Sequence, residues 1–496
     1  MNIALIYPRW TSEYGIFGHF AKAASVWPPL ILAYLAALAE KDGHNVIIID
    51  AEAENLPIPA VINRLRDFNV DIIGITATTP FFHTSTKLGE QIKKDLPKVP
   101  LVIGGHHVTS VKEEGFYSCF DYAFIGEAEI SWIEFLRKYA NNEDVTTTKG
   151  ILYRKDGKVI FTGEAKRVED VNTLPLPARH LLKPHLYNVG TLQGKKQFTS
   201  IYTIWGCPFR CIFCCTGAFI GKKMRKKDPQ AVIEEIKHVI KTDGTKHFLF
   251  LDDTLTMDRS HIMEICNLII KEKLDITFEG GTRANLVDEE LIKTLKEAGL
   301  TRLCFGLEAV DEKIRKIMRK EVPLEAYVKA NEISNRYGIQ TLNSCMIGLP
   351  GESREAIEKT LDFLDKQHEI KQANIAIAVP YPGTELYHMA KRGDHGLKLL
   401  TEDYSKYIRY NSAVMQVGDL SPNDLIELQN YAFLSVYTAP WRLKSMISRS
   451  QKKALFLMFL RFVKYVYALL KGSENVTWRI FRFKKQSYDS CQTNTV

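Results

Sequence analysis

The sequence predicts an α/β protein with a doubly wound parallel sheet, a (β/α)6 partial barrel and a mainly helical C-terminal region. Short apolar runs alternate with helical segments in two separate series, and a compact cysteine cluster opens the second series. Runs that are apolar on both faces and separated by helices are typical of parallel sheets covered on both sides. The two series therefore predict two α/β domains in one chain.

The first series occupies residues 1–140 and predicts the doubly wound sheet. We expect helices at 29–41, 60–68, 84–96 and 129–139, and strands at 3–7, 45–49, 72–76, 101–103 and 122–125. In open parallel sheets, ligands bind beyond the carboxyl ends of the strands. Thr76, Gly104, Gly105 and His106 stand at or just after such strand ends, which makes them candidate ligand contacts.

Residues 141–195 contain turn and hairpin material, and we interpret them as a linker between the domains. The second series follows at 196–390, with strands expected at 198–204, 247–252, 275–280, 301–307, 339–346 and 373–380. Six parallel strands with five intervening helices fit a (β/α)6 partial barrel that is open on one side. Residues 391–496 are expected to be mainly helical.

Composition indicates a reducing compartment. The nine cysteines are scattered, and the N-terminus predicts a β-strand instead of a signal peptide, so we expect a cytoplasmic protein without a disulfide framework. The net charge of +8 is concentrated at the C-terminus, where residues 441–486 hold 12 Lys or Arg and one acid. The rest of the chain is slightly acidic, which argues against a nucleic-acid-binding surface.

Three cysteines, Cys207, Cys211 and Cys214, lie within one short stretch, and no nearby pair completes a set of four ligands. Iron–sulfur clusters are normally held by four thiolates. A compact trio therefore indicates a cubane with one iron open to a ligand that is not protein. The alternatives are a zinc knuckle or a chance group of buried thiols, but zinc sites favour paired C-x2-C units, which this chain lacks.

The C-x3-C-x2-C spacing, with Phe213 before the last cysteine, resembles the cluster loop of radical S-adenosylmethionine (radical SAM) enzymes. The resemblance implies a [4Fe-4S] cluster whose open iron chelates SAM, and reductive cleavage of SAM to a 5′-deoxyadenosyl radical. It covers roughly residues 196–390, because further motifs follow the cysteines in the family's order. It also implies an electron donor such as flavodoxin or ferredoxin.

The resemblance places SAM contacts at the ends of successive barrel strands. Asp252 and Asp253 stand where the family usually has Gly-Gly-Glu, and an ordinary strand-end cap is the alternative for this pair. The other implied contacts follow later strands and are Arg283, Glu308, Gly348 and Gly351.

The order of the two domains resembles the B12-dependent class of the family, and residues 100–109 and 121–129 match that class. The resemblance implies cobalamin at Thr76, Gly104, Gly105 and His106, where the glycines would admit the broad corrin. The Asp-x-His-x-x-Gly motif that places a histidine on cobalt is absent. We therefore expect no histidine on cobalt, and a relic domain that binds no corrin is the alternative.

The apolar stretch at 454–470 is interrupted by Arg461 and Lys464 and is short for a membrane span. Its cations form one stripe at helical spacing, which fits a helix lying in a membrane interface. The alternative is a helix docked on the barrel. Interfacial binding would indicate peripheral contact with the inner face of the membrane and a lipid-like substrate.

The function expected is hydrogen abstraction from an unactivated carbon of a small-molecule or lipid-like substrate, followed by cobalamin-dependent C-methylation. Radical oxidative cyclisation, as in the anaerobic cyclase of magnesium-porphyrin synthesis, or C–C coupling is the alternative within the family. A non-catalytic iron–sulfur or corrin sensor at the membrane is the alternative from another class.

Overall fold

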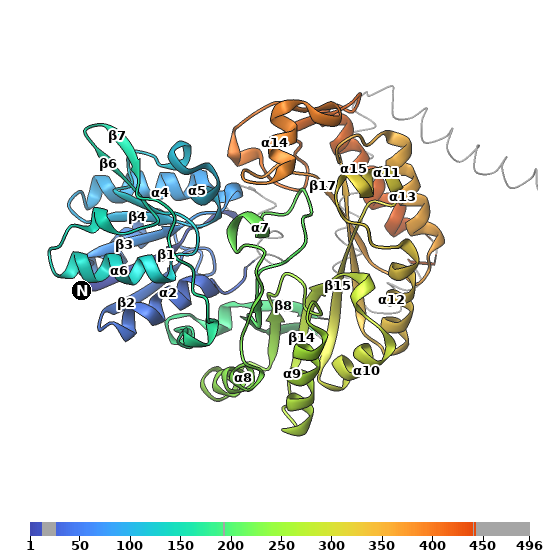
Figure 1. The fold of residues 1–496 in the computed structure, drawn as a ribbon, viewed down its shortest axis with the longest axis horizontal. Coiled ribbons are helices and arrows are strands. Elements are labelled where there is room, and N and C mark those ends of the chain that lie inside the picture. The colour runs from blue at the N-terminus through green and yellow to red at the C-terminus, as the bar shows by residue number, and fades with distance from the viewer. Residues whose placement is uncertain (12–25, 192–193, 440, 443–496) are drawn as a thin grey trace, which may run out of the picture.

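The computed structural model describes residues 1–11, 26–191, 194–439 and 441–442, and Figure 1 shows two α/β bodies side by side. The N-terminal body is built on a seven-stranded sheet in the order β2-β1-β3-β4-β5-β6-β7. Its strands are β1 (Asn2–Tyr7), β2 (Asn45–Asp50), β3 (Ile72–Thr76), β4 (Leu101–Gly104), β5 (Tyr122–Phe124), β6 (Ile151–Lys155) and β7 (Lys158–Phe161).

The first five strands are parallel and follow the doubly wound order 2-1-3-4-5, as expected from the sequence. Strands β1 and β3 are almost wholly buried, because helices cover both faces of the sheet. These helices are α2 (Leu30–Lys41), α3 (Ile58–Asp67), α4 (Phe82–Asp95), α5 (His106–Val111) and α6 (Glu129–Ala140). All carboxyl ends of the parallel strands therefore meet at one edge.

The segment at 141–195 does more than link the bodies, which corrects the expectation for its first part. Its hairpin β6–β7 pairs antiparallel with β5 and extends the first sheet by two strands. The buried Ile151 and Leu152 supply the apolar contact, and Leu152 joins the same core as the parallel strands. A second hairpin, β8 (Asn188–Thr191) and β9 (Gly194–Gln197), leads into the second body.

The second body contains six parallel strands paired in chain order, as expected for an open (β/α)6 arrangement. The strands are β10 (Thr199–Ile201), β13 (His247–Phe250), β14 (Thr277–Thr282), β15 (Leu300–Glu308), β16 (Gln340–Ile347) and β17 (Ala373–Ile377). The helices between them are α7 (Thr216–Phe219), α8 (Pro229–Asp243), α9 (Arg259–Lys271), α10 (Glu289–Glu297), α11 (Glu312–Ile317), α12 (Leu324–Arg336) and α13 (Arg354–Lys366).

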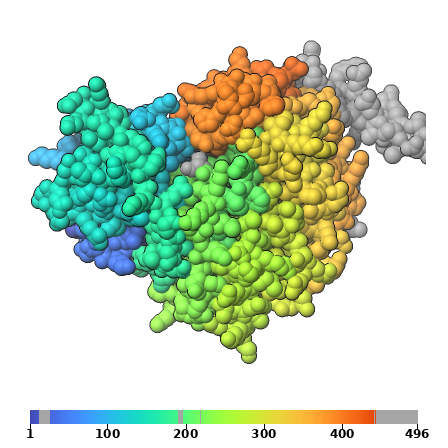
Figure 2. Space-filling model, in the orientation of Figure 1, coloured from blue at the N-terminus to red at the C-terminus, as the bar shows by residue number. Residues whose placement is uncertain are grey.

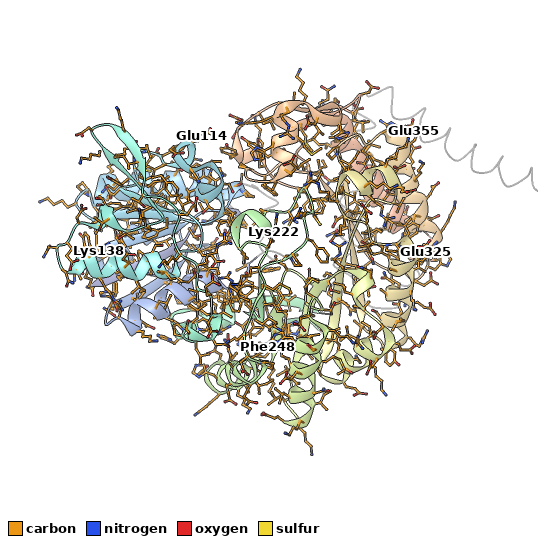
Figure 3. The ribbon with its side chains drawn as sticks, viewed as in Figure 1. Glu114, Lys138, Lys222, Phe248, Glu325 and Glu355 are labelled. Carbon is orange, nitrogen blue, oxygen red and sulfur yellow. The ribbon has the colours of Figure 1, made fainter. Side chains whose placement is uncertain are left out.

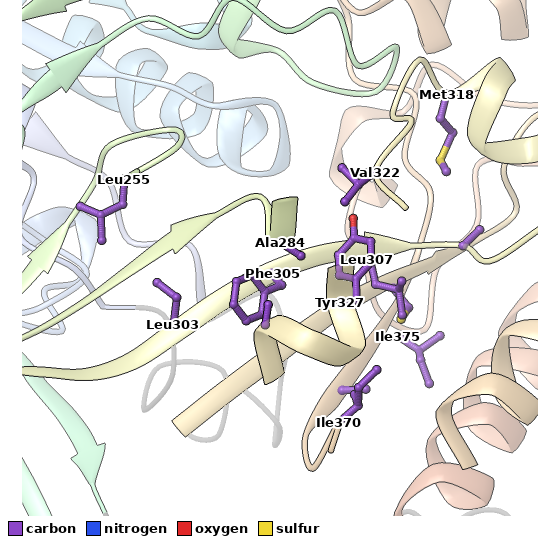
Figure 4. Packing of buried hydrophobic residues seen from close by; sticks show 14 of the residues in the cluster. Leu255, Ala284, Leu303, Phe305, Leu307, Met318, Val322, Tyr327, Ile370 and Ile375 are labelled. Atoms are coloured by element: carbon purple, nitrogen blue, oxygen red, sulfur yellow. The ribbon is translucent and has the colours of Figure 1, made fainter. Parts of the chain in front are cut away.

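Alternate residues of β15 show how these strands divide their two faces. Leu303, Phe305 and Leu307 are buried in the core between sheet and helices, where Tyr327 of α12 joins them (Figure 4). The residues between them are only half-buried. This period of two is the pattern of a strand with one face against the helices and the other toward the barrel interior.

Local sequence fixes where the barrel helices begin. Asp228, Asp258 and Asp288 each stand just before a helix and accept a hydrogen bond from a backbone N–H of its first turn. Each of these helices therefore starts directly after a loop, and the loops that join the carboxyl ends of the strands to these helices carry the site residues.

The described part of the C-terminal region is less helical than expected. After α14 (Glu385–Arg392), strands β18 (Leu397–Leu399) and β19 (Met415–Val417) form an antiparallel pair, and α15 (Pro422–Thr438) follows. Ser421 and Asp424 form a capping box that starts α15. On the face shown in Figure 2, this orange region abuts both bodies. The apolar stretch at 454–470 lies outside the described residues.

Candidate active site

The three cysteines of the triad lie on one loop between β11 (Ile204–Trp205) and α7. Strand β11 pairs antiparallel with β12 (Arg225–Lys226), so the two ends of the loop are clamped together. Cys207 N donates to the Gly221 carbonyl oxygen at 3.3 Å, and Cys214 N donates to the Cys211 carbonyl oxygen at 3.1 Å. The loop therefore has a fixed shape that presents all three thiols from one short segment.

Gly206 is required at the base of this loop. Its φ is +91°, a conformation that other residues adopt at a cost, and a Cβ there would lie 2.5 Å from the Lys223 carbonyl oxygen. The main chain before Cys207 thus lies close to the segment that leads into β12, and glycine allows that approach.

The surroundings of the thiols fit a cluster. Burial raises the pKa of Cys207 and of Cys211, while Lys320 and Arg283 oppose the shift at Cys211 by stabilising its thiolate. Arg283 Nη1 lies 4.0 Å from Cys211 Sγ. In the described ranges, no three His, Cys, Asp or Glu side chains are close enough to hold a single metal ion. Three thiols presented by one loop, with two cations beside Cys211, fit the thiolate ligands of an iron–sulfur cluster.

The acidic pair after β13 divides into two roles. Asp252 is buried, and its carboxylate accepts from Thr203 N at 2.7 Å and from Ile204 N at 3.1 Å. Burial raises the pKa of Asp252 to about 6. Its oxygens thus hold the segment that enters the cysteine loop, which is the cap expected as the alternative to a SAM contact. Asp253 accepts one hydrogen bond from Thr216 of α7 at 2.7 Å.

Arg283 lies between the cysteine loop and the end of β14. Its guanidinium carbon lies 3.7 Å from the centre of the Phe209 ring, a cation–π contact that orients the group. Arg283 Nε is buried and has no hydrogen-bond partner among the described residues. An unpartnered buried donor beside the cluster loop fits an anionic ligand, such as the carboxylate of SAM.

Glu308 ends β15 in a left-handed conformation, with φ +63°, at an irregularity in the pairing with β16. Its Oε1 lies 2.7 Å from Nζ of Lys320, and both side chains are about nine-tenths buried. Lys320 Nζ also lies 5.7 Å from the centre of the Phe213 ring in the cysteine loop. Lys320 was not predicted as a site residue, because only its place after α11 brings it back to the end of β15.

The glycine-rich segment after β16 is a turn held by Glu352. The buried Glu352 accepts from Gly348 N at 2.7 Å and from Leu349 N at 3.0 Å through one carboxylate oxygen. Gly351 N donates to the His395 carbonyl oxygen at 3.0 Å. Burial raises the pKa of Glu352 to about 8, so the carboxyl is largely protonated at neutral pH. The structure therefore gives Gly348 and Gly351 a fixed turn at the strand end.

The candidate cobalamin contacts gather at the carboxyl edge of the first sheet. Thr76 ends β3 and Gly104 ends β4, and the two are paired neighbours in the sheet. Gly105 has φ +109°, and a Cβ there would lie 2.5 Å from the Ala77 carbonyl oxygen. Close packing of two loops of the protein therefore accounts for Gly105. A Cβ at Gly104 would meet only Phe124, at 3.8 Å, so that position has room beside it.

His106 joins the two halves of the site. It begins α5 at the edge of the first sheet, and its ring centre lies 3.7 Å from that of Phe219 in α7. Part of the residue stays exposed, but desolvation of the ring by the neighbouring protein lowers its pKa to about 4, so the imidazole is neutral at physiological pH. The next residue, His107, is buried against Phe82 and Tyr404 and is structural.

Further contacts hold the first sheet against the cysteine loop. Arg225 of β12 pairs with Glu127, which follows β5, with Arg225 Nη1 at 2.8 Å from Glu127 Oε2. Side chains fill the space where the bodies meet, around the loop that carries Lys222 (Figure 3). Sequence reasoning missed this ion pair, because its members are 98 residues apart. The carboxyl edge of the first sheet and the cysteine loop therefore form one continuous site.

Comparison with known proteins agrees with this geometry. Residues 201–364 match the radical SAM superfamily, and residues 18–135 match the B12 binding domain. An uncharacterized methyltransferase of Pyrococcus horikoshii is 31% identical over 83% of this chain and 88% of its own length. The anaerobic magnesium-protoporphyrin IX monomethyl ester cyclase of Rubrivivax gelatinosus is 26% identical over 87% of this chain and 77% of its own length.

A solved structure has the same fold over nearly the whole chain. The cobalamin-dependent radical enzyme OxsB, with aqua-cobalamin and S-adenosylmethionine bound, aligns with a TM-score of 0.72 and 15% identity. The alignment covers 99% of this chain and 75% of that protein.

The fold and the site define a radical-generating enzyme with two cofactor domains. The chain belongs to the radical SAM superfamily, in the class that carries a B12-binding domain. The radical SAM domain corresponds to the expected [4Fe-4S] cluster and SAM, and the B12-binding domain corresponds to the expected cobalamin. None of the helices among the described residues has the length and apolar character needed to cross a membrane.

Proposed function

We propose that the protein transfers a methyl group to a carbon atom of a small-molecule substrate in a cobalamin-dependent radical reaction. The observation that carries the proposal is the contact of α5 with α7 through His106 and Phe219. This contact brings the carboxyl edge of the B12-binding sheet directly against the end of the cysteine loop. A substrate between the two cofactors would then lie within reach of both.

Cys207, Cys211 and Cys214 would hold the cluster, with Arg283 and Asp253 as charged groups beside the loop for the carboxylate and ammonium of SAM. Thr76, Gly104 and Gly105 would line the corrin side. When bound, these cofactors supply the substrate radical and the methyl group, which acid–base side chains cannot provide at an unactivated C–H bond.

The chain's own residues position these groups and set their electrostatics. Glu308 ties Lys320 to the end of β15, which places a buried cation near Cys211. Asp252 and Gly206 fix the entry to the cysteine loop. Neutral His106 adds no charge at the junction between the two bodies.

Two further parts of the proposal concern partners. A flavodoxin or ferredoxin would supply the electron that the cluster needs. Peripheral membrane contact would come from the basic segment at 441–486, most of which lies outside the described residues. Truncation near residue 440 followed by liposome co-sedimentation tests the second point, and unchanged binding would exclude the tail as the anchor.

Radical oxidative cyclisation is the second candidate, because the Rubrivivax cyclase matches most of the chain. The two reactions differ in what becomes of SAM. Methylation with remethylation of the corrin yields S-adenosylhomocysteine together with 5′-deoxyadenosine, whereas cyclisation yields 5′-deoxyadenosine alone. Quantifying both nucleosides after anaerobic turnover separates the candidates, and product formation without S-adenosylhomocysteine would refute methylation.

A further inference from the structure

Arg409 stands at the junction of the two bodies on a segment that the family match at 201–364 does not include. Its carbonyl oxygen accepts from Ile377 N at 3.0 Å, so residue 409 lies alongside the carboxyl end of β17. Five residues earlier in the same segment, the Tyr404 ring packs on His107 of the first body, with centres 4.5 Å apart. The segment thus spans from the barrel mouth to the B12-binding body.

The buried Gln429 of α15 holds this main chain in place. Gln429 is 1% exposed, and its Nε2 donates to the carbonyl oxygens of Arg409 at 2.9 Å and Ile375 at 3.0 Å. Its Oε1 accepts from Asn411 N at 2.9 Å. Three hydrogen bonds from one buried side chain fix residues 409–411 against β17. The main chain that carries the Arg409 side chain is therefore held in a fixed position.

The side chain of Arg409 is exposed but enclosed by protein on several sides. Tyr381 packs against the same small cluster as Tyr407, two residues before Arg409, and Tyr381, Tyr410 and Cys215 are the ionisable groups close enough to act on the guanidinium. Cys215 directly follows the cluster ligand Cys214. Across the described part of the chain, no Asp or Glu pairs with Arg409, whereas the exposed Arg392 of α14 pairs with Glu385 and Asp394.

The residues around the Arg409 side chain also border the proposed reaction site. Tyr381 is on the loop after β17, and Gly383 of that loop touches Ser110 of α5, since a Cβ there would lie 2.8 Å from Ser110 Oγ. Helix α5 also carries His106, which contacts α7. Arg409 and Tyr381 therefore lie beside the place where the B12-binding edge and the cysteine loop meet. They offer a guanidinium cation and a hydroxyl donor there, and no acidic side chain of the described residues pairs with the guanidinium.

We propose that Arg409 and Tyr381 bind an anionic group of the substrate, a carboxylate or a phosphate, and hold the substrate between the two cofactors. The proposal rests on the proposed function and adds a substrate class to it. A guanidinium on a rigid base can bind either anion bidentately, and the Tyr381 hydroxyl adds a neutral donor. An uncharged lipid would not satisfy this pair.

The test uses the full chain with its cofactors, prepared without oxygen, and phenylphosphonate and benzoate as probes. We expect both anions to bind the wild-type protein and to protect Arg409 from modification by phenylglyoxal, as measured by peptide mass spectrometry. Benzyl alcohol, a neutral aromatic control, should not protect it. Arg409→Gln should weaken anion binding by about tenfold to a hundredfold, the worth of a charge-assisted hydrogen bond, and Arg409→Lys by less.

Arg392→Gln, which removes an exposed arginine of α14, is the matched control and should leave probe binding unchanged. Equal protection of Arg409 by benzyl alcohol, or equal anion binding by Arg409→Gln, would overturn the proposal. A second measurement uses SAM with a deuterated methyl group and small molecules from a cell extract. A labelled product in the fraction retained by an anion exchanger supports the proposal, and a labelled neutral product refutes it while leaving methylation intact. Absence of both nucleosides would instead count against the proposed function.

Discussion

The buried pair of Lys320 and Glu308 gives a stability prediction at the centre of the site. Lys320→Met removes the partner of a carboxylate that is held at 2.7 Å and is only 8% exposed. Replacing one member of a buried pair leaves an uncompensated charge, which costs about 3–5 kcal/mol of folding free energy. The double variant Lys320→Met with Glu308→Gln removes both charges and should recover most of that loss.

A matched control lies on the neighbouring helix. Lys316 and Glu312 form an ion pair at 2.7 Å on α11, but their side chains are 63% and 77% exposed. Lys316→Met should therefore leave the unfolding free energy unchanged within the error of the measurement. Urea unfolding of the four proteins, followed by circular dichroism, gives the comparison. The reasoning is refuted if Lys320→Met costs less than about 1 kcal/mol, or if the double variant is no more stable than the single one.

Three further predictions concern the cluster loop, the glycine-rich turn and the junction. Cys211→Ala should abolish reductant-dependent 5′-deoxyadenosine, whereas Cys215→Ala should retain it; equal loss in both would mean that Cys215 acts as a ligand. Burial raises the pKa of Glu352 from 4.5 to about 8, so the folded state holds this proton more tightly and stability falls as pH rises between these values. Glu352→Gln removes this pH dependence of the unfolding free energy, which is at most about 1.4 kcal/mol per pH unit. Urea midpoints measured near pH 5 and pH 8 test this, and the same change with pH in both proteins would contradict the raised pKa of Glu352. Glu127→Gln leaves Arg225 buried without its carboxylate, and it should lower the unfolding free energy by about 3–5 kcal/mol; a change below about 1 kcal/mol in thermal or urea unfolding would show that the pair is not buried in solution.

The parallel strands could be predicted from the sequence because each is a short apolar run that is complete within a few residues. Strands β3 and β16, for example, fall within one residue of the expected ranges at 72–76 and 339–346. Helix starts were equally local, since a single Asp before the helix supplies the cap. The cysteine triad was predicted for the same reason, because its ligands come from one loop.

Features that depend on distant partners could not be predicted. The hairpin at 151–161 has the alternation of an edge hairpin, and nothing local shows that it pairs with β5. Two acids follow β13, but only the structure shows that Asp252 turns toward Thr203. Lys320 resembles any surface lysine in the sequence until the turn after α11 returns it to Glu308. The strand pair in the C-terminal segment that carries Arg409 was not predicted, because β18 and β19 are only three residues each.

The central claim is that the cysteine triad holds a cubane whose open iron binds SAM. Electron paramagnetic resonance of the reduced, cluster-loaded protein with and without SAM tests it most directly. We predict a [4Fe-4S]⁺ signal whose shape changes when SAM is added, and no such signal in Cys211→Ala. A fully loaded cluster whose spectrum is unchanged by SAM would contradict the claim, because it would mean that no iron is open to the substrate.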